Sequence, residues 1–100
     1  MLMSEEIKVK HFPKFNKFIV RLGRGKYSFI EYEIKGNVLY VNKAFTPEEF
    51  RGRGIASRIM LEVIKFAKEK GFKIVPVCSF AEYFFKNILN IKNYFSNKFI

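Results

Sequence analysis

The residues best suited to chemistry lie in one short block, Thr46–Ala56, in which two arginines alternate with two glycines. The block follows an apolar, strand-like run and precedes residues at helical spacing, so its backbone N–H groups are expected at the positive end of a helix dipole. Glycine lets the backbone approach a ligand closely, and arginine is a bidentate donor to phosphate. The block therefore predicts an anion site that suits a phosphorylated ligand.

Three strands are expected to lead into this block, over residues 17–22, 27–34 and 38–45. Each is an apolar-rich run bounded by glycine or asparagine turns. Strands joined by such short turns form an antiparallel meander. A further alternation over 7–12 predicts an edge strand, which Pro13 interrupts.

Apolar residues recur at helical spacing after the block and predict a helix over 54–70, with Gly71 as its C-terminal cap. A strand over 72–78 and a last helix from about Phe80 to Ile88 should follow. The predicted fold is mixed α+β: an antiparallel β-meander and then a β-α-β-α core, with the block at the carboxyl end of a strand.

Two capping boxes are expected at the starts of helical turns. In the first, Thr46 is the N-cap and Glu49 the returning carboxylate, with proline at the first helical position. In the second, Ser79 and Glu82 have the same spacing at the start of the last helix.

The composition favours one folded domain over residues 1–100, because 18% of the residues are aromatic and no linker divides the chain. The net charge of +10 predicts attraction to polyanions, whether a phosphorylated cofactor, nucleic acid or an acidic membrane surface. A single cysteine excludes an intrachain disulfide, and no apolar run approaches the roughly 20 residues that span a bilayer. We expect a cytoplasmic protein without a metal site; the oligomeric state is left open.

The pattern Arg51-x-x-Gly54-x-Ala56 resembles the pyrophosphate loop of the GCN5-related N-acetyltransferases (GNATs). The predicted order strand, loop, helix, strand, helix is also similar to the cofactor-binding core of that family. Pro76-Val77-Cys78-Ser79, followed by Tyr83, looks like the minimal single-domain branch, whose members have a P-x-C motif. The resemblance covers about residues 16–88.

Two departures from the minimal branch concern proton transfer and substrate. Lys43-Ala44 stands where members of that branch have a His-Thr pair, and Asn87-Ile88 stands where a His-Pro pair is expected after the last helix. Neither change touches the loop that the resemblance assigns to the cofactor.

The resemblance implies transfer of an acetyl group from acetyl-coenzyme A to a primary amine on a protein or a small molecule. It places the pantetheine arm against the backbone of Phe45 and Thr46. The pyrophosphate is assigned to residues 51–57, namely Arg51, Gly52, Arg53, Gly54, Ile55, Ala56 and Ser57.

Four residues are candidates for the chemistry itself. Cys78 precedes a helix start that is expected to lower its pKa, so it could be acetylated first, or it could only pack beside the cofactor. Tyr83 could protonate the departing thiolate, or it could be a core aromatic. Glu33, with Glu31 beside it, could accept a proton from the amine, although both are also typical of solvated carboxylates balancing lysines.

Three other interpretations accompany this one. His11, the only histidine, is more typical of a solvated side chain on a lysine-rich edge than of a proton carrier. A nucleic-acid-binding module, at least a nonspecific one, fits the interleaved basic and aromatic residues of 8–32. A GNAT-like protein that binds coenzyme A without catalysis fits the same loop. The tail from Asn90 to Ile100 is aromatic and basic, and no form is predicted for it.

Overall fold

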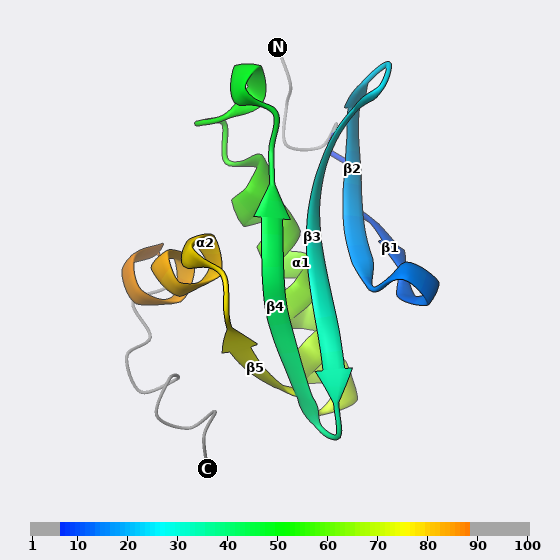
Figure 1. The fold of residues 1–100 in the computed structure, drawn as a ribbon, viewed down its shortest axis with the longest axis vertical. Helices are drawn as coiled ribbons and strands as arrows, with labels where there is room; N and C mark the ends of the chain where they lie inside the picture. Colours follow the sequence, from blue (N-terminus) through cyan, green and yellow to red (C-terminus); the bar gives the residue numbers. More distant parts are fainter. Residues whose placement is uncertain (1–6, 89–100) are drawn as a thin grey trace.

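A computed structural model describes residues 7–88 of the chain, and in these residues two helices lie on one face of a five-stranded sheet (Figure 1). Residues 1–6 and 89–100, which include the tail from Asn90, lie outside this range. Over the described range no helix is both long and apolar enough to cross a membrane.

The strands lie side by side in the order in which they follow along the chain: β1 (Lys10–Phe12), β2 (Lys17–Gly23), β3 (Lys26–Lys35), β4 (Val38–Phe45) and β5 (Lys73–Pro76). The first four are antiparallel to their neighbours, and β5 is parallel to β4. Glycines at positive φ, Gly25 and Gly36, make the two tight turns of the meander possible. The predicted fold class and mixed sheet are confirmed. Strand β1 begins at Lys10 rather than at Ile7, so it is shorter than expected, and it ends as predicted before Pro13, where a 3₁₀ turn begins.

Helix α1 (Ile55–Lys70) connects the two parallel strands, as the helical spacing predicted. It buries one stripe of side chains against the sheet: Ile55, Ile59, Met60, Val63 and Ala67. Gly71 ends it in the left-handed conformation, with φ of 76°, and the amide of Phe72 donates back to the Ala67 carbonyl oxygen at 2.8 Å.

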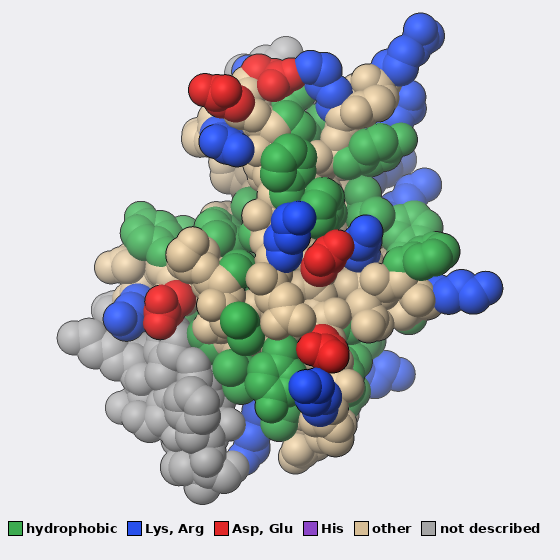
Figure 2. All heavy atoms as spheres, viewed as in Figure 1, with side chains coloured by type: hydrophobic (Ala, Val, Ile, Leu, Met, Phe, Trp, Pro, Cys, Tyr) green, Lys and Arg blue, Asp and Glu red, His purple; other side chains and the backbone are tan. Residues whose placement is uncertain are grey.

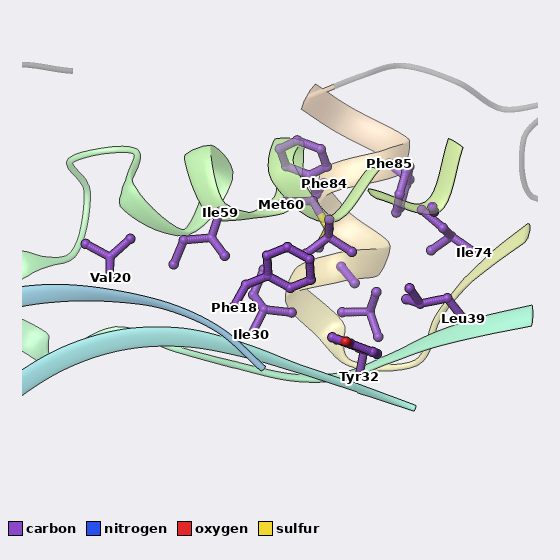
Figure 3. Packing of buried hydrophobic residues seen from close by; sticks show 14 of the residues in the cluster. Phe18, Val20, Ile30, Tyr32, Leu39, Ile59, Met60, Ile74, Phe84 and Phe85 are labelled. Carbon is purple, nitrogen blue, oxygen red and sulfur yellow. The ribbon is translucent and has the colours of Figure 1, made fainter. Parts of the chain in front are cut away.

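The last predicted helix is present but irregular. It begins as α2 (Ser79–Tyr83) and continues as a π-helical turn over Phe84–Ile88. Phe84 and Phe85 are both buried, and Figure 3 shows them beside Met60 and Ile74. One hydrophobic cluster thus joins both helices to the same face of the sheet.

Both predicted capping boxes are wrong. The residues at the N-cap positions are Pro47 and Cys78, and neither makes a side-chain capping bond. The Thr46 hydroxyl instead lies 2.7 Å from that of Ser28, and Glu49 forms an ion pair with Lys26 in the β2–β3 hairpin. Tertiary partners have therefore replaced the local contacts that the spacing suggested.

The expectation of a solvated His11 is also wrong. The register pairs His11 with Phe18, so the imidazole lies on the core face of β1, stacked on the Phe18 ring at 3.9 Å between centroids. Its Nε2 atom is 2.6 Å from the Tyr32 hydroxyl, and the Phe66 ring approaches edge-on. Partial burial lowers the pKa of His11 and raises that of Tyr32.

Candidate functional site

The strands β4 and β5 separate halfway along β4. Their pairing ends at Val41 and Pro76, and the amides of Val77 and Cys78 both donate to the Val41 carbonyl oxygen, at 3.0 and 3.1 Å. Beyond that point β4 continues to Phe45, paired with β3, while the chain after β5 turns into α2. The last residues of β4 therefore have no strand paired with them on the β5 side, and a gap is left there.

A cavity of about 400 Å³ lies at this gap. Its walls come from the end of β4, the loop before α1, the first turn of α1, and α2 with the π-helical turn. The lining residues are Ala44, Phe45, Thr46, Phe50, Arg51, Gly52, Gly54, Ile55, Ala56, Ser57, Phe80, Tyr83 and Ile88. Eight of the nine residues predicted to bind a cofactor are brought together here; the exception is Arg53.

The first turn of α1 presents backbone donors to this cavity. Gly54 is the N-cap residue, with φ of 78° and no side-chain cap, and the amide of Arg58 makes a helical bond back to its carbonyl oxygen at 3.0 Å. The preceding amides, those of Ile55, Ala56 and Ser57, have no acceptor within the helix. Together with the helix dipole they form a site suited to an anion.

The two arginines of the loop have different surroundings. Arg51 donates from Nε to the Thr46 carbonyl oxygen at 2.9 Å, which fixes its guanidinium at the cavity wall. Arg53 lies over the ring of Phe50, with 5.2 Å from its guanidinium carbon to the ring centroid. Arg51 is therefore placed to contact a ligand, whereas Arg53 packs on the outside of the loop.

Sequence reasoning missed Ser28, which positions the cavity wall. Its side chain is fully buried on β3, and its hydroxyl donates to the Phe45 carbonyl oxygen at 2.8 Å. Because that bond uses its one proton, the Thr46 hydroxyl must be the donor in the 2.7 Å contact between the two hydroxyl groups. The available signal was a polar residue at an inward position of a predicted strand, which requires a partner.

Of the four candidate catalytic residues, one lines the cavity and three do not. Tyr83 lines it with 55% of the residue exposed, which excludes the core-aromatic interpretation. Cys78 is half-buried against the core, and the cavity wall described above does not include it. Glu33 is exposed, 3.5 Å from the side-chain nitrogen of Asn42, and Glu31 is paired with Lys17 at 3.3 Å.

The groups that line the cavity are suited to binding an anion rather than a metal ion. Backbone N–H groups and a guanidinium are donors, and neither ligates a cation. Over residues 7–88 no group of three or more His, Cys, Asp or Glu side chains is arranged to hold a metal ion.

Comparison with known proteins matches the chain to a family model and to solved structures. The family model described as GCN5-related N-acetyl-transferase matches residues 17–90. The NMR solution structure of a GCN5-like protein from Staphylococcus aureus superimposes with a TM-score of 0.67 at 23% sequence identity, over 92% of this chain and 86% of that one. The second match is a similarity of fold.

Proposed function

The chain belongs to the GCN5-related N-acetyltransferase family, and from this we propose that it is an active enzyme that binds acetyl-coenzyme A in the cavity between β4, α1 and α2. The observation that carries the proposal is the uncapped first turn of α1, which opens onto that cavity. A phosphate group is the ligand that such a helix start accepts most readily.

The residues present fit coenzyme A. The amides of Ile55, Ala56 and Ser57 would hold the pyrophosphate, with Arg51 as an additional donor beside them. The backbone at the end of β4, around Phe45, would receive the amide groups of the pantetheine arm, because β5 does not pair with it there. Apolar side chains on the α2 side, Phe80 and Ile88, would cover the arm from the other side.

Acetyl-coenzyme A supplies an activated acyl group as a thioester. The contribution of the protein is then mainly to orient the reactants and to manage protons. Tyr83 Oη is the titratable side-chain atom in the cavity wall that can hold and donate a proton, and we assign it the leaving-group side of the reaction. We infer that the acetyl group passes directly from the cofactor to the amine. In this route Cys78 only lies near the site, and Glu33 would act on the amine through water.

The acceptor in this proposal is a primary amine, either a lysine or N-terminus of a protein or a small molecule. The net charge of +10 repels polycations at long range, which argues against polyamines and strongly basic tails. Acetylation of a neutral or acidic lysine peptide faster than of spermidine is the expected order.

Two measurements test this proposal separately. Calorimetric titration with acetyl-coenzyme A tests binding, and thiol release in the presence of a panel of amines tests transfer. Binding with turnover of at least one amine is expected. Binding without turnover of any amine would favour the alternative of a non-catalytic coenzyme A-binding protein, and no binding at millimolar ligand would contradict both.

A further inference from the structure

A second cavity lies over β1, β2 and the start of β3, whereas the candidate cofactor site lies at β4. Its volume is about 540 Å³, and it is lined by Lys8, Lys10, Phe12, Ile19, Arg21, Leu22, Gly23 and Tyr27. The register pairs Lys10 with Ile19 and Arg21 with Tyr27. These residues alternate with core-facing ones such as Phe18 and Ser28, so they lie on the face that neither described helix covers.

The chemistry of this cavity is cationic and aromatic. Lys8, Lys10 and Arg21 are its charged residues, all exposed, and its lining contains no carboxylate. Two large rings stand beside them, with Phe12 38% exposed and Tyr27 44% exposed. We refer to these five residues as the β1–β2 cationic cavity.

The same character continues along the sheet from this cavity. Phe29 follows Tyr27 on the same face of β3, about 7 Å further along the strand, and its ring has Lys17 and Lys43 above it at 5.4 and 5.9 Å. The Phe45 ring packs beside Phe29 at 5.5 Å. Figure 2, viewed onto this face, shows hydrophobic and basic side chains interspersed across the strands, with a few acidic ones among them.

We propose that the β1–β2 cationic cavity and the adjoining rings of β3 form a binding surface for single-stranded nucleic acid. Cations spaced along the face match the phosphates of a backbone, and rings two residues apart on one strand provide platforms for successive bases. An acidic peptide would match the cations but would leave the exposed rings without stacking partners. The observations therefore favour nucleic acid over an acidic protein.

The test uses the full-length protein and fluorescence anisotropy with 5′-labelled U12 and dT12, at several salt concentrations. The first variant combines Lys8→Gln, Lys10→Gln and Arg21→Gln. Its matched control combines Lys65→Gln, Lys68→Gln and Lys86→Gln, three exposed lysines on α1 and the π-helical turn, and it has the same net charge. The cavity variant should lose at least about 10-fold in affinity and about 2 in the slope of log K against log salt, whereas the control loses less than about 3-fold.

The second variant separates a nucleic-acid surface from simple attraction between charges. Phe12→Ala with Tyr27→Ala should weaken U12 binding by at least about 5-fold, while inorganic polyphosphate, which has no bases, should bind as to the wild type. Unequal affinities for U12 and dT12 would show whether the surface prefers this RNA or this DNA, and either preference supports the proposal.

Three outcomes would overturn it. The control and cavity variants could lose affinity equally, the aromatic variant could bind U12 as well as wild type does, or a poly-glutamate peptide could compete as well as U12. Circular dichroism and thermal melting of the same variants should match the wild type, which shows that they are folded without relying on the proposed binding of acetyl-coenzyme A.

Discussion

The buried hydroxyl of Ser28 donates a 2.8 Å hydrogen bond to the Phe45 carbonyl oxygen, at the point where β4 ends and the candidate cofactor cavity begins. The bond joins β3 to the last residue of β4, after which the chain leads into α1. A residue of the protein core thus holds a wall of the site without itself lining the cavity.

Ser28→Ala is expected to reduce both stability and cofactor affinity. It leaves a backbone carbonyl and the Thr46 hydroxyl without this partner, at a cost of about 1–3 kcal/mol in the free energy of unfolding. Urea denaturation and calorimetry with acetyl-coenzyme A measure the two effects. Ser79→Ala, at an exposed serine, is the control and should change neither the stability nor the affinity. If the two variants have the same stability and the same affinity, Ser28 does not position the site.

The backbone conformation of Gly54 is expected to matter more for binding than the charge of Arg53. A Cβ at Gly54 would meet nothing within 4 Å, so the cost of a substitution comes from φ of 78° rather than from a clash. Gly54→Val should strain the first turn by about 1–3 kcal/mol and weaken acetyl-coenzyme A by about 10-fold or more. Gly54→Asn tolerates this φ and should lose less.

Arg53→Ala provides the comparison within the same loop. Arg53 packs on Phe50, outside the set of residues that line the cavity, so its removal should change acetyl-coenzyme A affinity by less than about 3-fold. A larger loss for Arg53→Ala than for Gly54→Val in calorimetry would show that charge, not the helix start, makes the anion site.

Tyr83→Phe should reduce turnover while leaving cofactor binding intact. The substitution removes only the hydroxyl that we assign to proton donation, so kcat should fall by about 100-fold with an unchanged Kd for acetyl-coenzyme A. Steady-state kinetics with the best amine, over a range of pH, measure this. Turnover equal to wild type would remove Tyr83 from the chemistry.

Cys78→Ala tests the route of transfer. If transfer to the amine is direct, the variant keeps most of its turnover and shows a ternary-complex rate pattern. Wild-type protein incubated with acetyl-coenzyme A alone should show no added acetyl group by intact-mass measurement. An acetyl adduct that Cys78→Ala abolishes, with a ping-pong pattern, would instead establish a covalent route.

The partly buried position of His11 predicts a loss of stability in mild acid. Its pKa is lowered in the folded protein, so the unfolded chain binds the proton first, and stability decreases as pH falls through about 6.5, the ordinary value for histidine. The melting temperature should therefore drop between pH 7.5 and 5.5. His11→Phe should have a smaller drop; an equal drop would assign the effect to other groups.

Regular patterns predicted most of the fold. The strands 17–22, 27–34 and 38–45 and the helix 54–70 each differ from the observed bounds by no more than one residue at either end, because alternation, helical spacing and glycine turns act locally. The first capping box failed because Thr46 and Glu49 contact Ser28 and Lys26, both distant in sequence; the second failed because α2 has Cys78 as its N-cap residue. His11 was misassigned because only the register with β2 determines which face it occupies.

The sequence identified the loop of the candidate site, but it did not predict which other parts of the chain form the cavity around that loop. Residues 51–57 form a contiguous motif, so it could be anticipated that most of them line one cavity, although Arg53 does not. The separation of β4 from β5 beyond Val41 depends on tertiary structure, as does the placement of Tyr83 in the wall and of Cys78 and Glu33 outside it. The assignment of Pro76-Val77-Cys78 to a minimal branch of the family stays a prediction.

The central claim is that the uncapped start of α1 binds the phosphates of acetyl-coenzyme A, and a ¹H–¹⁵N correlation NMR titration tests it most directly. The account predicts that the amide resonances of Ile55, Ala56 and Ser57 shift together and saturably as acetyl-coenzyme A is added, at both low and physiological salt. Amides around Lys10 and Arg21, on β1 and β2, should shift far less. Unchanged resonances at the start of α1 with millimolar ligand, or shifts confined to the basic face, would contradict the account.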